Sequence, residues 1–167
     1  MLTLIKNIFH KNENYDILIE DNKFSRIEKN ISTKADLEID GTNKAILPPF
    51  YNTHCHSPMN LLRGLGDDKE LFKWLNEDIW PMEAKFQDEE IYWGSKLAIL
   101  EMIKTGTVFF SDMYFNQAPT IKAIDEMGVR AAISVVEFDL FDKNQTENKK
   151  TETLNFLKLE NPCPDRI

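Results

Sequence analysis

Apolar and polar residues alternate in short runs through the first 45 positions. Such alternation is typical of β-strands that bury one face. It predicts four strands, at residues 2–9, 15–20, 23–29 and 36–40. Asp21-Asn22, between the second and third strands, is typical of a tight hairpin turn. We therefore expect a small β unit in this part of the chain.

From residue 45 onward, short apolar runs alternate with helical periodicity. The predicted strands are residues 45–56, 107–113 and 129–138. The predicted helices are residues 67–80, 88–104, 119–127 and 152–159, with a polar loop at 142–150. Pro81 is expected to stop the first helix, and Gly106 and Gly128 to end the next two. This order predicts parallel βαβ units, with which both an open doubly wound sheet and a (β/α)8 barrel begin.

Composition indicates a soluble globular protein, because 42% of the 167 residues are hydrophobic and 29% are charged. A net charge of −8 argues against nucleic acid or an anionic membrane as a partner, since both need clustered lysine and arginine. No apolar stretch approaches the ~20 residues that cross a bilayer, and we expect no secretory signal. Cys55 and Cys163 suggest no disulfide framework, so a cytoplasmic location is expected.

Two histidines, His54 and His56, stand one residue apart at the end of the predicted strand 45–56. Alternate side chains of a strand share a face, so the two imidazoles are expected to point the same way and Cys55 the opposite way. Neutral imidazoles bind zinc and other first-row metals. A catalytic zinc usually has three protein ligands, and the remaining histidine, His10, lies near the N-terminus. The pair therefore predicts part of a metal site.

The surroundings of this pair form a longer ordered string of motifs. The string comprises Pro48-Pro49-Phe50-Tyr51-Asn52-Thr53-His54-Cys55-His56, Asn60-Leu61-Leu62-Arg63-Gly64-Leu65, Asp67-Asp68, Trp74-Leu75, Ile79-Trp80-Pro81, Glu83-Ala84-Lys85-Phe86, Gly106-Thr107 and Ser111-Asp112-Met113-Tyr114-Phe115. Over roughly residues 1–130 it resembles the amidohydrolase superfamily. Within that superfamily it is similar to the branch of 5′-methylthioadenosine/S-adenosylhomocysteine deaminases and chlorohydrolases. Pro49 departs from the glycine that is usual in this motif.

The resemblance implies an α/β fold, namely the N-terminal part of a (β/α)8 TIM-like barrel preceded by strands of a small β-sandwich. Residues 1–45 would form part of the sandwich, and residues 46–167 the first half of a metal-dependent hydrolase barrel. A full barrel takes about 250 residues. We therefore expect the barrel to be incomplete here and the chain to be the N-terminal portion of a longer enzyme. Alone, it is expected to be inactive and either poorly folded or self-associated, because half a barrel exposes an unpaired strand edge.

The function that the resemblance implies is metal-dependent hydrolytic deamination of a purine nucleoside, such as 5′-methylthioadenosine or S-adenosylhomocysteine. His54 and His56 would be metal ligands for Zn²⁺ or another divalent transition metal such as Fe²⁺. Glu83 would hold the ribose hydroxyls and Trp80 would line the substrate pocket. From the residues alone, Glu83 would be interpreted as a solvated acid between helices, and Trp80 is equally compatible with an anchor of the helix end. The later metal ligands and proton-transfer residues of the family have no match, so no catalytic residue is predicted within this chain.

Other functions stay open from the sequence. One is a guanine or cytosine deaminase, or a triazine chlorohydrolase, of the same superfamily. Another is an inactive truncated protein. The expected partner is a small nucleoside-like molecule, and the resemblance is compatible with a homo-oligomer.

Several further residues are expected to have structural roles. Arg63 is expected to stabilise the loop after the first barrel strand by pairing with Asp67 or Asp68. Asp112 is expected to make structural hydrogen bonds near the active end of the next strand. The residues expected to pack in the core are Trp74 and Trp93.

Overall fold

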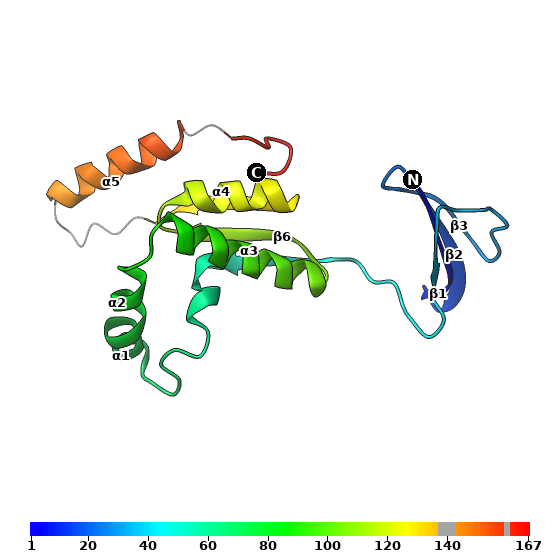
Figure 1. Cartoon of the computed structure of the whole chain (residues 1–167), viewed down its shortest axis with the longest axis horizontal. Coiled ribbons are helices and arrows are strands. Elements are labelled where there is room, and N and C mark those ends of the chain that lie inside the picture. Colours follow the sequence, from blue (N-terminus) through cyan, green and yellow to red (C-terminus); the bar gives the residue numbers. More distant parts are fainter. Residues whose placement is uncertain (137–142, 159–160) are drawn as a thin grey trace. The chain divides into compact units, whose positions relative to one another are not determined.

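The computed structural model describes residues 1–136, 143–158 and 161–167 (Figure 1). The chain divides into two compact units, Met1–Pro48 and Pro49–Ile167. The first unit is a single β-sheet, and the second consists of parallel strands covered by helices. Among the described helices, none is long and apolar enough to cross a membrane.

The first unit is a mixed four-stranded sheet with the strand order β3-β2-β1-β4. Its strands are β1 (Leu2–His10), β2 (Glu13–Glu20), β3 (Lys23–Glu28) and β4 (Leu37–Asp40). The pairs β1–β2 and β2–β3 are antiparallel, whereas β4 runs parallel to β1. Asp21 and Asn22 both have positive φ, as a tight hairpin turn requires. The four strands expected here are all present.

Residues 45–56, which were expected to form one strand, contribute to both sheets. The start of the expected strand is therefore wrong. Ala45 forms an isolated parallel bridge with Phe9 of β1. The strand of the second unit, β5 (Phe50–Cys55), begins only after Pro48 and Pro49. Proline has no backbone N–H to donate to a ladder, which explains why the two sheets separate at this point.

The second unit holds three parallel strands in the order β5-β6-β7. Its remaining strands are β6 (Thr107–Tyr114) and β7 (Arg130–Val135), and its helices include α3 (Asp88–Lys104) and α4 (Gln117–Met127). Figure 1 shows α3 and α4 beside β6. Both helices pack on the sheet through one apolar cluster, whose buried members are Ile99, Phe110, Ala123, Ile124, Ala131 and Cys163. The predicted parallel βαβ units are therefore confirmed.

The segment between β5 and α3 differs from the single helix expected at 67–80. A 3₁₀ helix, η1 (Ser57–Leu62), comes first, and a helical segment follows as α1 (Leu71–Trp74), the π-helical η2 (Leu75–Ile79) and α2 (Trp80–Glu83). Pro81 lies inside this segment and does not stop it. The π-type turn just before Pro81 shifts the hydrogen-bond ladder, so the missing proline N–H disrupts the helix less than it would in a regular α-helix.

The C-terminal part contains α5 (Lys143–Phe156). The polar loop expected at 142–150 is therefore wrong from residue 143 onward, and the helix expected at 152–159 begins earlier. The helix is polar along most of its length, and the Lys149–Glu152 ion pair at 2.6 Å helps to stabilise it. The ends of two predicted elements, residues 137–138 and 159, lie outside the described residues.

Candidate metal centre and substrate pocket

His54 and His56 lie side by side at the carboxyl end of β5. Their ring centroids are 4.9 Å apart, with an interplanar angle of 83°. His56 Nδ1 lies 2.6 Å from the carbonyl oxygen of Met113 in β6. A carbonyl oxygen only accepts hydrogen bonds, so Nδ1 carries the proton and the lone pair of Nε2 is free. A metal-ligating histidine commonly has this partner on its other nitrogen.

The pair supplies two imidazole donors and no complete metal site. Across the ranges that the structure describes, no group of three or more His, Cys, Asp or Glu side chains is placed to hold a metal ion. His10 belongs to β1 and packs edge-on against Tyr15. Cys55 packs against the apolar cluster, and burial, with a contribution from Asp112, raises the pKa of its thiol to about 12. A thiol that stays protonated at neutral pH is a poor metal ligand.

Asp112 of β6 fixes the turn that directly follows His56. Its side chain is only 2% exposed. Oδ1 accepts a hydrogen bond from the Ser57 backbone N–H at 2.8 Å, and Oδ2 accepts one from the Ser57 hydroxyl at 2.7 Å. Burial raises the pKa of the Asp112 carboxyl, and the hydrogen bonds from Ser57 oppose that rise. The structural hydrogen-bonding role expected for Asp112 is present.

The polar contacts of Asp112 continue into both covering helices. The Ser57 hydroxyl lies 3.1 Å from that of Ser95 in α3, which lies 3.0 Å from the hydroxyl of Thr120 in α4. Ser57, Ser95 and Thr120 are all fully buried. These buried hydroxyls find hydrogen-bond partners in one another only when η1, α3 and α4 pack in this arrangement. A different packing would leave some of them unpaired, so the contacts fix how the three elements lie.

A second close approach holds η1 against α3. A Cβ atom on Gly94 would lie 2.6 Å from the carbonyl oxygen of Pro58, so only glycine fits at this helix position. Arg63, at the other end of η1, pairs with Glu101 of α3 at 2.6 Å. The expected partners Asp67 and Asp68 are therefore wrong, because the contact is made to a helix distant in sequence.

The residues expected to bind substrate lie on α2. Glu83 is half-buried, and Trp80 is 48% exposed. Sequence reasoning missed Tyr114 of β6, which is 5% exposed and whose hydroxyl has no hydrogen-bond partner in the described part of the chain. Burial and the nearby Glu83 carboxylate raise the pKa of Tyr114. The alternation that buries residues 110, 112 and 114 of β6 is the signal that could have placed Tyr114 on the inner face.

The two tryptophans expected in the core differ. Trp74 is half-buried, and its indole N–H donates to the Leu65 carbonyl at 2.9 Å. Trp93 is 54% exposed, so its expected core position is wrong. The inner face of α3 is formed instead by small and branched residues, among them Gly94 and Ser95, which allow η1 and α4 to approach closely.

We expect Asp112→Ala to lower the free energy of unfolding by about 3 kcal/mol, because two buried Ser57 donors lose their acceptor. Asp112→Asn keeps the shape and one acceptor oxygen, so its loss should be about 1 kcal/mol. Urea denaturation of the 167-residue chain measures both, with the exposed Asp67→Ala as the control. A loss for Asp112→Ala no larger than that of the control would contradict the role of this carboxylate.

Comparisons with known proteins show which family model and which relatives the chain matches. The model of the Amidohydrolase family matches residues 45–161. The 5′-deoxyadenosine deaminase of Methanocaldococcus jannaschii is 44% identical over 163 residues, which are 96% of this chain and 39% of that protein. The 5-methylthioadenosine/S-adenosylhomocysteine deaminase of Thermococcus sibiricus is 48% identical over 144 residues, which are 86% of this chain and 34% of that protein. The chain thus spans less than half of the length of these relatives.

Solved structures share the fold at lower sequence identity. A zinc-bound adenosine deaminase from Xanthomonas campestris has a TM-score of 0.72 at 23% identity, over 95% of this chain and 40% of that one. The atrazine chlorohydrolase of Arthrobacter aurescens, in complex with zinc, has a TM-score of 0.70 at 19% identity, over 96% of this chain and 44% of that one. The resemblance in the motif string is therefore confirmed by independent comparisons. With its family match extending over most of its length, the chain belongs to the amidohydrolase family.

Proposed function

We propose that this chain supplies the first metal ligands and part of the nucleoside pocket of a metal-dependent aminohydrolase. The proposed substrate is an adenosine derivative such as 5′-methylthioadenosine or S-adenosylhomocysteine. The observation that carries the proposal is the His54–His56 pair, with Nε2 of His56 left free by the hydrogen bond to Met113. The pair lies at the carboxyl end of a parallel strand, where (β/α)8 barrels place their chemistry.

Zinc fits the donors that this chain offers. His54 and His56 would hold it through their imidazole nitrogens, which suit zinc and, less specifically, Fe²⁺. The zinc named for two solved structures of the same fold supports zinc as the first choice. A metal bound here would supply the means to lower the pKa of a water molecule toward neutrality. Further ligands must come from beyond this pair, since a catalytic zinc usually has three.

Glu83 is proposed to bind the ribose. A carboxylate accepts hydrogen bonds from two vicinal hydroxyls well, and such charged hydrogen bonds are stronger than neutral ones. The buried Tyr114 hydroxyl near Glu83 has a donor to offer, either to that carboxylate or to a ligand. The half-exposed indole of Trp80 is proposed to line the same pocket, where its flat apolar surface suits a purine ring.

The choice of a nucleoside over the alternative substrates rests on the relatives. Deaminases named for adenosine derivatives are 44% and 48% identical to this chain, whereas the triazine-acting neighbour is 19% identical. The lower value supports only a common fold. A nucleoside is therefore the substrate class that the similarity supports best.

Metal binding by the chain itself is the first test. We expect Co²⁺, a spectroscopic substitute for zinc, to bind the 167-residue chain weakly, because only two imidazoles hold it. His54→Ala and His56→Ala should each weaken this binding about tenfold or more, by removing one of the two donors. Absorption titration measures the affinity, and His10→Ala is the matched control. Unchanged affinity in both site variants, or a loss in the control alone, would refute the assignment.

The ribose contact is tested in a chimera, in which this chain replaces the matching 39% of the Methanocaldococcus jannaschii deaminase. We expect Glu83→Gln to lower kcat/KM for 5′-deoxyadenosine about 100-fold, because two hydrogen bonds to a charge are weakened. Activity on free adenine, which has no ribose, should change little. Glu77→Gln in the neighbouring η2 is the control.

The outcomes of the chimera test separate two claims. Equal losses on nucleoside and free base would contradict the role of Glu83 while leaving the deaminase proposal in place. A chimera that folds and binds zinc as the parent enzyme does, but deaminates no adenosine derivative, would contradict the proposed function.

A further inference from the structure

The hydroxyl of Tyr114 is a buried donor that the fold leaves unused. Tyr114 is the last residue of β6 and is 5% exposed, and within the described residues its hydroxyl has no hydrogen-bond partner. Asp112, on the same face of the strand, has both carboxylate oxygens bonded to Ser57. A buried polar group without a partner lowers stability, so phenylalanine would suit this position better if packing alone decided it. The hydroxyl therefore indicates a role other than folding.

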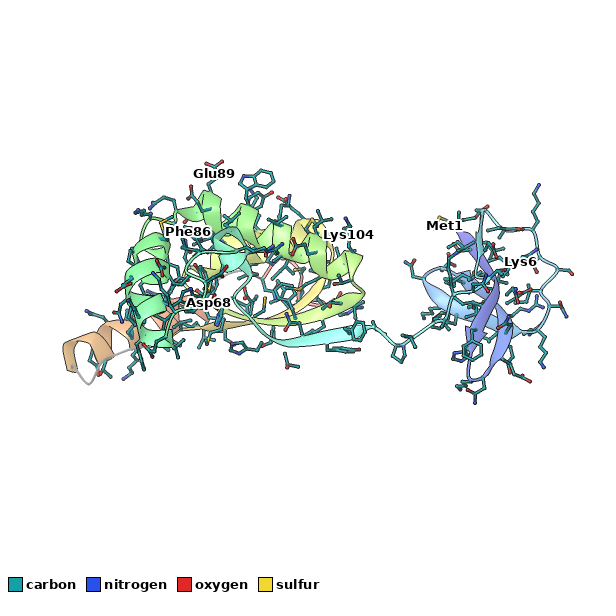
Figure 2. The ribbon with its side chains drawn as sticks, turned by 90° about the horizontal axis from the view of Figure 1, so that it is seen from below. Met1, Lys6, Asp68, Phe86, Glu89 and Lys104 are labelled. Carbon is teal, nitrogen blue, oxygen red and sulfur yellow. The ribbon has the colours of Figure 1, made fainter. Side chains whose placement is uncertain are left out.

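The connection from α2 to α3 brings Glu83 close to the end of β6. Glu83 ends α2, and its backbone carbonyl accepts a hydrogen bond at 3.0 Å from the N–H of Phe86, which Figure 2 labels. Asp88, the first residue of α3, accepts a hydrogen bond at 2.5 Å from the side chain of Asn116, two residues after Tyr114. The end of β6 and the short segment that follows Glu83 are therefore tied together.

Charge and burial indicate which partner is available to the Tyr114 hydroxyl. Burial and the nearby Glu83 carboxylate raise the pKa of Tyr114, so the phenol stays protonated at neutral pH and remains a donor. Its oxygen is shielded from solvent, so a dissolved molecule does not reach it in this arrangement. Glu83 is only half-buried and, when ionised, has two acceptor oxygens. The carboxylate can therefore accept from Tyr114 on one oxygen and face a ligand with the other.

We propose that Tyr114 is a positioning residue for Glu83. When a nucleoside is bound, the phenol donates to one carboxylate oxygen and holds the other in place for the ribose hydroxyls. An oriented carboxylate loses less conformational freedom on binding, and a hydrogen bond to a charged group is stronger than one between neutral groups. The inference rests on the ribose contact proposed for Glu83, and it assigns to that contact the residue that fixes its geometry. Tyr114 itself touches no substrate.

Kinetics of the Methanocaldococcus jannaschii chimera test this role. Tyr114→Phe should raise KM for 5′-deoxyadenosine about five- to tenfold and change kcat less than about twofold, because the lost contact serves substrate and transition state alike. Activity on free adenine, which has no ribose, should stay within about twofold. In the Glu83→Gln background, Tyr114→Phe should cost less than about twofold, since two residues that act together lose their joint effect only once. Losses that multiply in the double variant would overturn the proposal.

Thermal unfolding of the chimera separates positioning from a purely structural role. Tyr114→Phe should leave the melting temperature unchanged or raise it by about 1–2 °C, because a buried donor without a partner is removed. Tyr92→Phe is the matched control, because the Tyr92 hydroxyl of α3 donates to Glu126 at 2.5 Å. Its loss should lower the melting temperature and leave KM unchanged. A lower melting temperature for Tyr114→Phe, with equal losses on 5′-deoxyadenosine and adenine, would overturn the proposal.

The positioning role and the ribose contact fail in different ways. A selective loss on the nucleoside in Glu83→Gln, with Tyr114→Phe equal to the unmodified chimera, would leave the ribose contact in place and overturn the positioning role. Equal losses of Glu83→Gln on both substrates would overturn the ribose contact and the positioning role with it. Selective losses in both single variants, with no further loss in the double variant, would support both.

Discussion

The buried carboxylate of Asp112 is the constraint on which the rest of the second unit depends. It accepts both the backbone N–H and the hydroxyl of Ser57, the residue that directly follows His56. Its neighbour on β6, Met113, accepts the hydrogen bond from His56 Nδ1. Two consecutive residues of one strand therefore fix both the turn after the histidine pair and the orientation of the second imidazole. Because the carboxylate is almost inaccessible to water, water cannot readily replace the two Ser57 donors if the turn moves.

The covering helices depend on the same turn. Ser57 connects Asp112 to Ser95 of α3 and, through it, to Thr120 of α4, while Gly94 allows Pro58 to lie against α3. Packing of β6 against these helices thus combines an apolar cluster with a polar chain that is satisfied in only one arrangement. Buried polar networks of this kind define position more than they add stability. A metal ligand needs a fixed position, because a small displacement of its side chain changes the coordination geometry.

Local sequence patterns were sufficient for part of this picture. Alternation placed the strands, glycines marked the ends of α3 and α4, and the one-residue spacing of His54 and His56 indicated paired imidazoles. Contacts between residues distant in sequence could not be read in the same way, as the Arg63–Glu101 ion pair shows. Trp93 illustrates a further limit. Its hydrophobicity predicted burial, but the close packing of η1 and α4 needed small residues inside α3 and left the large ring outside.

The central claim is that β6 holds His56 with its proton on Nδ1 and its Nε2 lone pair free. Long-range ¹H–¹⁵N correlation spectra of the ¹⁵N-labelled 167-residue chain, assigned with His56→Ala, report the tautomer of this imidazole directly. The account predicts the Nδ1–H tautomer without metal and a change at the ¹⁵N shift of Nε2 when Zn²⁺ is added. An Nε2–H tautomer, or a rapid mixture of both forms that Zn²⁺ does not change, would contradict it.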